Sequence, residues 1–234
     1  MNKDVIIACD FSTQEQTLTF LDKFQDVKPF VKIGMELFYA CGPDFVKTIK
    51  SRGHKIFLDL KLHDIPNTVK KTMHVLSMLD VDMCNVHAAG GIEMMKYAIE
   101  GLTRPDGTRP LLIAVTQLTS TSEDMLHNEL LIGNTMNDTI VHYAKNAKNA
   151  GLDGVVCSPL EAGEIKMQVE NDFLTITPGI RFEDSKKDDQ VRITTPALAR
   201  EFGSDFIVVG RPITMADDPV AAYKKCCQEF IHKL

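Results

Sequence analysis

Charged residues of opposite sign cluster in the segment 57–68, FLDLKLHDIPNT, which begins as an apolar run. Asp59 and Lys61 are two residues apart, so on a strand their side chains project from the same face, and Asp64 follows in the turn. A charge on a buried strand is costly unless it is paired. We interpret the cluster as a buried charge network, in which the lysine stays charged because aspartates flank it. The alternative is a solvated ion pair in a strand-to-helix loop.

A second lysine interrupts another apolar run. Lys32 stands between Val31 and Ile33, and its ammonium either points inward toward the charges at 59–64 or reaches out to the rim of the sheet. Asp10 follows the first apolar run of the chain. It could complete the same group of charges or serve only as the N-cap of the first helix.

Two glycine–arginine pairs suggest an anion site. Gly179 and Arg181 follow one apolar run near the C-terminus, and Gly210 and Arg211 follow the next. Glycine allows backbone amides to approach a ligand closely, and the guanidinium fork of arginine matches phosphate. Together the two pairs predict a phosphate-binding site.

The segment 181–193, RFEDSKKDDQVRI, lies between these two pairs and contains few apolar residues. It is either an exposed loop or a lid that closes over the phosphate. In the second case Gln190 supplies a neutral donor that could hold the lid shut.

These residues lie in or directly after eight short apolar runs. Stretches with helical spacing separate one run from the next. Short apolar runs that alternate with helices indicate a parallel sheet covered on both faces. Eight strands close a (β/α)8 barrel, whereas an open doubly wound sheet would normally carry a glycine fingerprint after its first strand. We predict an α/β fold, a (β/α)8 TIM barrel with residues 1–234 as a single domain. The expected strands are Val5–Cys9, Phe30–Ile33, Ile56–Leu60, Asp82–Val86, Leu111–Val115, Gly154–Cys157, Phe173–Thr177 and Phe206–Val209.

The barrel prediction explains why the charged residues and the glycines recur at run ends. Chemistry in these barrels takes place at the C-terminal ends of the strands, and the loops after strands 7 and 8 commonly bind phosphate. Local signals for the helices agree with this pattern. They are a capping box at Ser12 and Glu15, an N-cap and first-turn proline at Asp218 and Pro219, and C-terminal glycines at Gly53, Gly151 and Gly203.

Composition excludes several other classes of protein. The chain has 234 residues with 44% hydrophobic and 25% charged residues, which is typical of a globular protein. A net charge of −6 and the lack of a long Lys/Arg run argue against nucleic-acid binding. No apolar run is long enough for a membrane span or a signal peptide, so we expect a cytoplasmic protein whose six cysteines are reduced.

Metal and cofactor motifs are not found in the sequence. There is no HExxH motif, close His/Cys cluster, P-loop or GxSxG motif. We expect His63 to be a local loop or interface group, whereas His87 either serves the site or caps its strand. The sequence therefore predicts neither a metal site nor a cofactor.

The motif D-x-K-x-x-D at 59–64 resembles the signature of the orotidine 5′-phosphate decarboxylase family. The segments VKIGMELF, NVHAAGG, VTQLTSTS, TPGIR and VVGRPIT also resemble the bacterial form of that family, and the resemblance extends from Asp10 to the last helix. It implies a cofactor-independent carboxy-lyase that converts orotidine 5′-phosphate to UMP in de novo pyrimidine synthesis. It also implies a homodimer with shared active sites.

The resemblance further implies a role for each site residue. Lys61 would be the general acid that protonates C6 of the pyrimidine, within an array of alternating charges formed with Lys32, Asp59 and Asp64. The ribose would be contacted by Asp10 and Lys32, the pyrimidine edge by Thr119, and the 5′-phosphate by Arg181, Gln190, Gly210 and Arg211. The active site of the neighbouring subunit would be entered by Asp64 and Thr68.

Two alternatives stay open at this point. The first is a magnesium-dependent decarboxylase or aldolase of sugar phosphates, which shares D-x-K-x-x-D but needs a further carboxylate at the end of the second strand. Lys32 occupies that place, and its charge would repel Mg²⁺. The second is a non-catalytic barrel that binds a phosphorylated ligand, which would not need Lys61 between two aspartates.

Overall fold

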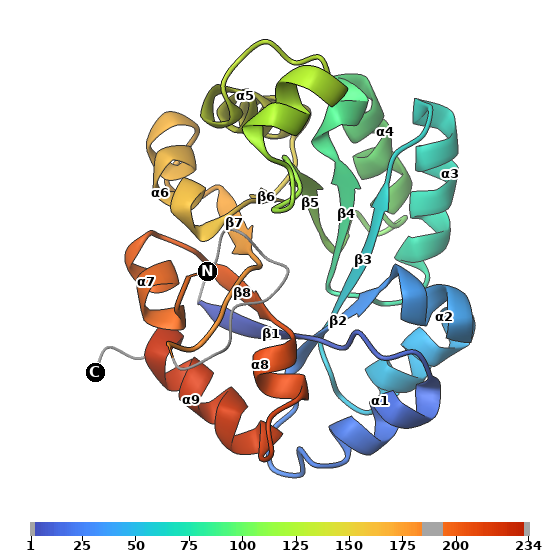
Figure 1. The fold of residues 1–234 in the computed structure, drawn as a ribbon. Coiled ribbons are helices and arrows are strands. Elements are labelled where there is room, and N and C mark those ends of the chain that lie inside the picture. Colours follow the sequence, from blue (N-terminus) through green and yellow to red (C-terminus); the bar gives the residue numbers. More distant parts are fainter. Residues whose placement is uncertain (1–2, 184–193, 232–234) are drawn as a thin grey trace.

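Eight parallel strands form a closed barrel in sequence order, and β8 pairs with β1 (Figure 1). The computed structural model describes residues 3–183 and 194–231. The barrel confirms the predicted fold class, while the extent of the domain over the whole range 1–234 stays a prediction. The strands are β1 (Asp4–Ala8), β2 (Phe30–Gly34), β3 (Ile56–Leu62), β4 (Met83–His87), β5 (Leu111–Val115), β6 (Gly154–Val156), β7 (Leu174–Thr177) and β8 (Phe206–Val209).

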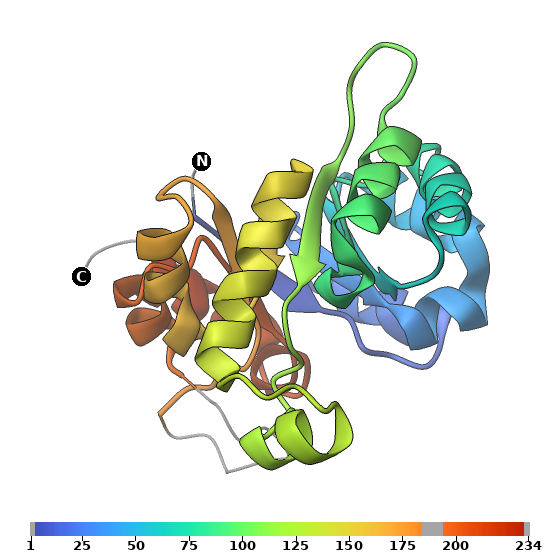
Figure 2. The ribbon, with the colours of Figure 1, turned by 90° about the horizontal axis from the view of Figure 1, so that it is seen from above.

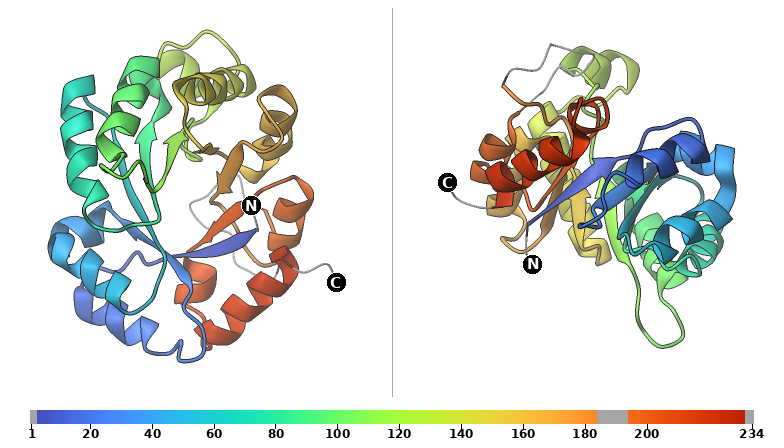
Figure 3. Two further views of the ribbon diagram at one scale, coloured as in Figure 1. Left: turned by 180° about the vertical axis from the view of Figure 1, so that it is seen from behind. Right: turned by 90° about the horizontal axis from the view of Figure 1, so that it is seen from below.

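Helices surround the barrel on its outer face, and α3 and α4 lie side by side on one flank (Figures 1 and 3). A short π-helical turn, η2 (Met125–Glu129), and a 3-10 turn, η1 (Ala88–Gly90), belong to the connections after β5 and β4. The helices are α1 (Gln14–Leu21), α2 (Met35–Ser51), α3 (Pro66–Ser77), α4 (Gly91–Leu102), α5 (Met136–Ala150), α6 (Pro159–Gln168), α7 (Pro196–Glu201), α8 (Arg211–Thr214) and α9 (Pro219–Ile231).

The strands alternate between two buried cores. Side chains that point into the barrel fill its interior, among them Phe30, Phe57, Met83, Ile113 and Phe206. The side chains of opposite parity pack outward against the helices in a larger core. Because the interior is filled in this way, ligands are confined to the ends of the strands.

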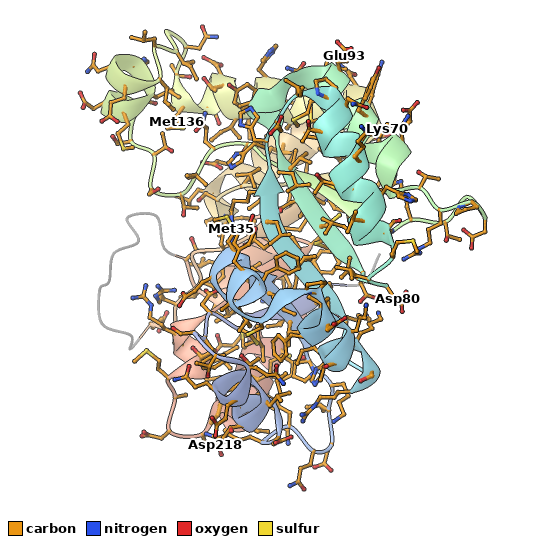
Figure 4. All side chains as sticks on the ribbon, turned by 90° about the vertical axis from the view of Figure 1, so that its right-hand side faces the viewer. Met35, Lys70, Asp80, Glu93, Met136 and Asp218 are labelled. Atoms are coloured by element: carbon orange, nitrogen blue, oxygen red, sulfur yellow. The ribbon has the colours of Figure 1, made fainter. Side chains whose placement is uncertain are left out.

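The C-terminal ends of the strands therefore define the functional end of the barrel. In Figure 4, Met35 and Met136, which open α2 and α5, lie toward one end, and Asp80, in the connection entering β4, lies toward the other. Figure 2 shows the connection between α4 and β5 projecting from that second end. The functional end is thus the one marked by Met35.

Three aspartates at the N-terminal ends of the strands each connect two neighbouring strands through a hydrogen bond. Each directly precedes a strand, and its carboxylate accepts a hydrogen bond of 2.7 to 2.8 Å from an amide at the start of a neighbouring strand. Each also pairs with a cation from the segment that precedes this neighbouring strand in the chain. The aspartate, amide and cation are Asp82, Ile56 and Lys50; Asp153, Leu112 and Arg109; and Asp205, Thr175 and Lys166.

Most predicted local signals agree with the structure, and one is wrong. All eight expected strands are present, with ends within two residues of those predicted. Asp218 Oδ1 accepts hydrogen bonds from the amides of Val220 and Ala221, and the predicted C-terminal glycines have φ of 87°, 92° and 95°. The capping box at Ser12 and Glu15 is wrong, since Thr13 is the N-cap of α1. The Ser12 hydroxyl instead donates to Glu36 in α2.

Candidate active site

Two adjoining cavities open at the functional end of the barrel. One has a volume of about 650 Å³ and the other about 230 Å³, and both are lined by Lys32, Pro178 and Val208. The larger is otherwise lined by Ala8, Asp10, Phe11, Gly179, Arg181, Gly210, Arg211, Thr214 and Met215. The smaller is otherwise lined by Phe57, Asp59, Lys61, Val115, Gln117, Leu118, Thr119, Ser120 and Val156.

A chain of alternating charges crosses the junction of these cavities. The Lys32 ammonium lies 2.9 Å from Asp10 Oδ1 and 3.3 Å from Asp59 Oδ2. The Lys61 ammonium lies 2.7 Å from Asp59 Oδ1. We call Asp10, Lys32, Asp59 and Lys61 the charged centre. The predicted inward orientation of Lys32 is confirmed, and Asp10 is not the N-cap of α1.

Burial and pairing act in opposite directions on the pKa values of this centre. Burial by itself would raise the pKa of Asp59, but the ammonium groups of Lys32 and Lys61 outweigh it and the pKa is lowered. Burial would likewise lower the pKa of Lys32, but Asp59 and Asp10 outweigh it and the pKa is raised. Both groups therefore stay ionised at neutral pH, although their side chains are only 10% and 12% exposed.

The backbone of β3 is irregular where it carries Lys61. Its register against β4 shifts between Leu58 and Leu62, and Lys61 has a left-handed φ of 52°. The regular alternation assumed from the sequence therefore does not explain why Lys61 reaches Asp59. Asn85 in β4, to which the sequence analysis gave no role, contacts both residues. Its Oδ1 accepts from the amide of Lys61 at 2.8 Å, and its Nδ2 donates to Asp59 Oδ1 at 2.7 Å.

Asp64 lies apart from this centre within one chain. Its side chain is exposed, and Oδ1 accepts a hydrogen bond from the amide of Ile65 at 2.7 Å. Within residues 3–183 and 194–231, Asp64 forms no ion pair with Lys61. Thr68, one turn further on, is also exposed and lines neither cavity. The structure thus brings Asp59 and Lys61 together, but not Asp64.

The ends of β7 and β8 form the far wall of the larger cavity. Gly179 has a φ of 84°, a conformation that favours glycine, and Gly210 is the N-cap of α8. Arg181 is buried and Arg211 opens α8, and both line the cavity. These are four of the five residues expected at the phosphate or beside it. The fifth, Gln190, and most of the predicted lid lie outside the described residues.

The chain enters and leaves the predicted lid at a single point of the cavity wall. The amide of Thr194 donates to the carbonyl of Gly179 at 3.0 Å, and the amide of Arg181 donates to the carbonyl of Thr194 at 3.0 Å. The two ends of the intervening segment are therefore tied together beside the arginine.

The smaller cavity combines apolar walls with a few polar groups. Phe57 comes from β3, Val115 from β5 and Val156 from β6. Thr119 lies on the connection after β5. Such a slot suits a flat, partly polar ring, and the charged centre lies at its mouth. Thr119 lines this slot, and its contact with the edge of a ring stays a prediction.

Two histidines lie near Lys61. The rings of His63 and His87 lie 5.8 Å apart between centroids, and the pKa of His87 is lowered by burial and by the neighbouring His63 and Lys61.

Gly34 lies directly beside the ion pair of Lys32 and Asp10. A Cβ at Gly34 would lie 3.2 Å from Lys32 Nζ and 3.3 Å from Asp10 Oδ1. The sequence analysis gave Gly34 no role, because the need for a bare backbone arises only once the ion pair is in place.

The fold and the site together define a (β/α)8-barrel enzyme with a lysine–aspartate centre between a wall that carries two arginines and an apolar slot. Residues 3–226 match the model of the orotidine 5′-phosphate decarboxylase / HUMPS family. The chain belongs to this family.

Relatives and solved structures agree with this membership. The chain is 56% identical over 233 residues to an orotidine 5′-phosphate decarboxylase of Geobacillus sp., with 98% of each chain covered. It is 57% identical over 228 residues to one of Staphylococcus saprophyticus, with 97% of each covered. A crystal structure of the Lactobacillus acidophilus enzyme superposes with a TM-score of 0.88 at 45% identity, covering 98% of this chain and 99% of that one.

Proposed function

We propose that this protein decarboxylates orotidine 5′-phosphate to UMP, the last step of de novo pyrimidine synthesis, at the charged centre. The observation that carries the proposal is the 2.7 Å pair between the Lys61 ammonium and Asp59 at the mouth of the apolar slot. The names of close relatives support the same substrate. No cofactor is part of the proposal.

The chemistry requires a group that stabilises a carbanion. Loss of CO₂ breaks the bond from C6 to the carboxylate and leaves the electron pair in an sp² orbital outside the π-system of the ring. Asp59 beside the substrate carboxylate raises the energy of that bound anion. The Lys61 ammonium stabilises the developing charge at C6 and then transfers a proton to it, after which the lysine regains a proton from water.

The remaining contacts follow the shape of the two cavities. In this proposal Asp10 and Lys32 bind the ribose, Thr119 meets the pyrimidine edge, and Arg181, Gly210 and Arg211 hold the 5′-phosphate. Gln190 is expected to join the phosphate contacts. Because phosphate lies far from C6, its binding energy is available to close the site and exclude water.

A magnesium-dependent sugar-phosphate reaction is the alternative within the same family. Lys32 argues against it, because its ammonium lies within 3.3 Å of both Asp10 and Asp59 and neutralises the carboxylates that a cation would use. Among the described residues, no group of three or more His, Cys, Asp or Glu side chains is arranged to hold a metal ion.

One assay separates these reactions and the non-catalytic alternative. Purified protein is mixed with orotidine 5′-phosphate, and loss of substrate absorbance is followed with and without EDTA. We expect turnover to UMP that is indifferent to the chelator. Activity that requires added Mg²⁺, or binding of the substrate without turnover, would overturn the proposal.

We also propose a homodimer in which Asp64 and Thr68 of one subunit complete the site of the other. The support is that Asp64 is exposed, lies at the functional end and does not reach its own Lys61. Ile65 beside it is 68% exposed, and a partner surface would remove this apolar side chain from water.

Subunit mixing tests the shared site. Asp64→Asn and Lys61→Ala subunits, each inactive as homodimers, are combined in equal amounts with verified exchange. A mixed dimer then holds one intact and one doubly defective site, so roughly a quarter of wild-type activity should return. A mixture as inactive as its parents would place Asp64 in its own subunit's site.

A cytoplasmic location is the last part of the proposal. All six cysteines are free thiols, which is typical of proteins in a reducing compartment. Within the described residues, no helix has the length and apolar character needed to cross a membrane. Fractionation of producing cells tests the location, and recovery outside the cytoplasm would contradict it.

A further inference from the structure

Asn85 is a buried amide inside the barrel. It lies in β4, where Met83 points into the barrel core and Cys84 and Val86 point outward toward the helices. By this alternation the Asn85 side chain points into the barrel, and the residue is 1% exposed. A polar group at such a position is costly unless it has hydrogen-bond partners.

Both ends of the Asn85 amide are used, and their orientation is determined by the partners. The amide of Lys61 can only donate, so it must face Oδ1, at 2.8 Å. The ionised Asp59 carboxylate can only accept, so it must face Nδ2, at 2.7 Å. One side chain therefore contacts the two members of the shortest ion pair in the charged centre.

The contact with Lys61 replaces a missing ladder hydrogen bond. The register between β3 and β4 shifts from Leu58 to Leu62, so Lys61 lies within the irregular stretch. Its φ of 52° places it in the left-handed region, which is unfavourable for a residue other than glycine. Without Asn85 the Lys61 amide would lose its partner, and a return to extended backbone would redirect the side chain.

We propose that Asn85 is a positioning residue that holds Lys61 in its left-handed conformation and fixes the Asp59 carboxylate opposite the ammonium. Asn85 does not touch the substrate in this proposal. Its effect on the rate is exerted through the placement of Lys61, so the inference rests on the proposed function.

The first test is Asn85→Leu, which keeps the approximate volume and deletes both hydrogen bonds. We expect kcat for orotidine 5′-phosphate to fall about a hundredfold, the loss associated with a misplacement on the order of 1 Å. The Kd for UMP should stay within about threefold, because the phosphate wall is intact. A folded variant that binds UMP and keeps kcat within about threefold of wild type would overturn the proposal.

Ser204→Ala is the matched control. Ser204 is fully buried, and its hydroxyl accepts a hydrogen bond from Thr177 at 2.9 Å, away from both cavities. We expect this variant to lose stability and to keep kcat. An equal loss of kcat in the two variants would show that Asn85 acts only through stability.

Asn85→Asp provides a second variant that preserves shape. The groups that face it are Asp59 and Lys61 in β3, Lys32 through Asp59, and His87 on its own strand, while its β5 partner Ile113 is apolar. Only a protonated Asp at this position can donate to Asp59. Its activity relative to wild type should therefore fall as pH rises, and a constant ratio near one would overturn the proposal.

A crystal structure of Asn85→Leu or, if that variant does not fold, Asn85→Asp at alkaline pH separates this inference from the proposed function. We expect Lys61 to leave the left-handed region and its ammonium to move away from Asp59. An unchanged φ and an unchanged 2.7 Å pair would overturn the inference, even if the protein acts on another substrate. Lack of turnover by wild type would overturn the proposed function alone.

Discussion

The Lys61 ammonium lies 2.7 Å from Asp59 Oδ1 although the two residues do not belong to a regular strand segment. This contact places a proton donor and a carboxylate together at the mouth of the apolar slot. The lysine side chain is 25% exposed, whereas that of Asp59 is 10% exposed. Both side chains line the smaller cavity, and the ammonium is the more exposed member of the pair.

Replacement of Lys61 by alanine should nearly abolish turnover and leave UMP binding largely intact, because the proposed phosphate contacts line the larger cavity and Lys61 does not. Part of the loss will reflect the unpaired Asp59. Steady-state kinetics and UMP titration measure the two effects. A loss of less than tenfold, about 1.4 kcal/mol of barrier, would exclude the role as general acid. Lys55→Ala is the control, since Lys55 is exposed at the opposite end of the barrel and pairs only loosely with Asp4, at 3.6 Å.

Gly34→Ala should disturb the charged centre, because the added methyl group would crowd Lys32 and Asp10. The new Cβ would lie 3.2 Å from Lys32 Nζ and 3.3 Å from Asp10 Oδ1, so the two charged groups must give way by a few tenths of an ångström. We expect kcat/KM to fall about tenfold, equivalent to about 1.4 kcal/mol. The matched control is Gly133→Ala, where nothing lies within 4 Å of the added carbon. Equal kinetics of the two variants would show that Lys32 tolerates the displacement.

The sequence contained enough information for the barrel and for most of the charged centre. For Lys32 the sequence left two orientations open, inward or toward the rim, because a lysine within a buried apolar strand has few stable alternatives. Its ion pairs with Asp10 and Asp59 decide for the inward one. Lys61 was assigned to the centre for a reason that is wrong, since an irregular strand rather than alternation directs it. The role of Asn85 could not be predicted, because it depends on a register shift between two strands that no local pattern encodes.

The error at α1 has a similar cause. Ser12 and Glu15 satisfy a local pattern, but Thr13 competes for the same role one residue later. The Ser12 hydroxyl forms a 2.6 Å hydrogen bond with Glu36, which is distant in sequence. Tertiary contacts of this kind decide between adjacent capping residues, so helix starts are harder to predict than the existence of helices.

Acid should destabilise the protein through Asp59. The folded-state pKa of this carboxyl is lowered by Lys32 and Lys61 against the effect of burial. Its contribution is therefore present above the unfolded pKa of about 3.9 and is lost as pH falls through the folded pKa. We expect the free energy of unfolding to fall more steeply below about pH 4 in wild type than in Asp59→Asn.

Urea denaturation at several pH values between about 3 and 6 measures these slopes. Asp44→Asn is the control, because Asp44 is 90% exposed in its pair with Lys47 and exposed pairs contribute little. Parallel curves for wild type and Asp59→Asn would contradict the prediction.

Arg211→Ala should weaken the binding of UMP more than the binding of uridine. Arg211 lines the larger cavity, where we propose that phosphate binds, and only UMP carries a phosphate for its guanidinium to hold. A hydrogen bond to a charged group contributes about 1.5–3 kcal/mol, so the Kd for UMP should rise roughly tenfold or more. Calorimetric titration with both ligands decides the matter, and equal losses would place Arg211 away from the phosphate.

Asp153→Ala should lower stability without changing the chemistry. Its carboxylate accepts from the Leu112 amide at 2.7 Å and pairs with both terminal nitrogens of Arg109, at the end of the barrel opposite the site. Loss of hydrogen bonds to a charged group costs about 1.5–3 kcal/mol, and each kcal/mol lowers Tm by roughly 2–4 °C in a domain of this size. Thermal unfolding should therefore shift by several degrees while kcat stays at the wild-type value. Asp153→Asn retains one acceptor, so its Tm should lie between those of wild type and Asp153→Ala. A fall in kcat beyond about threefold in a folded Asp153→Ala would show that the two ends of the barrel are coupled.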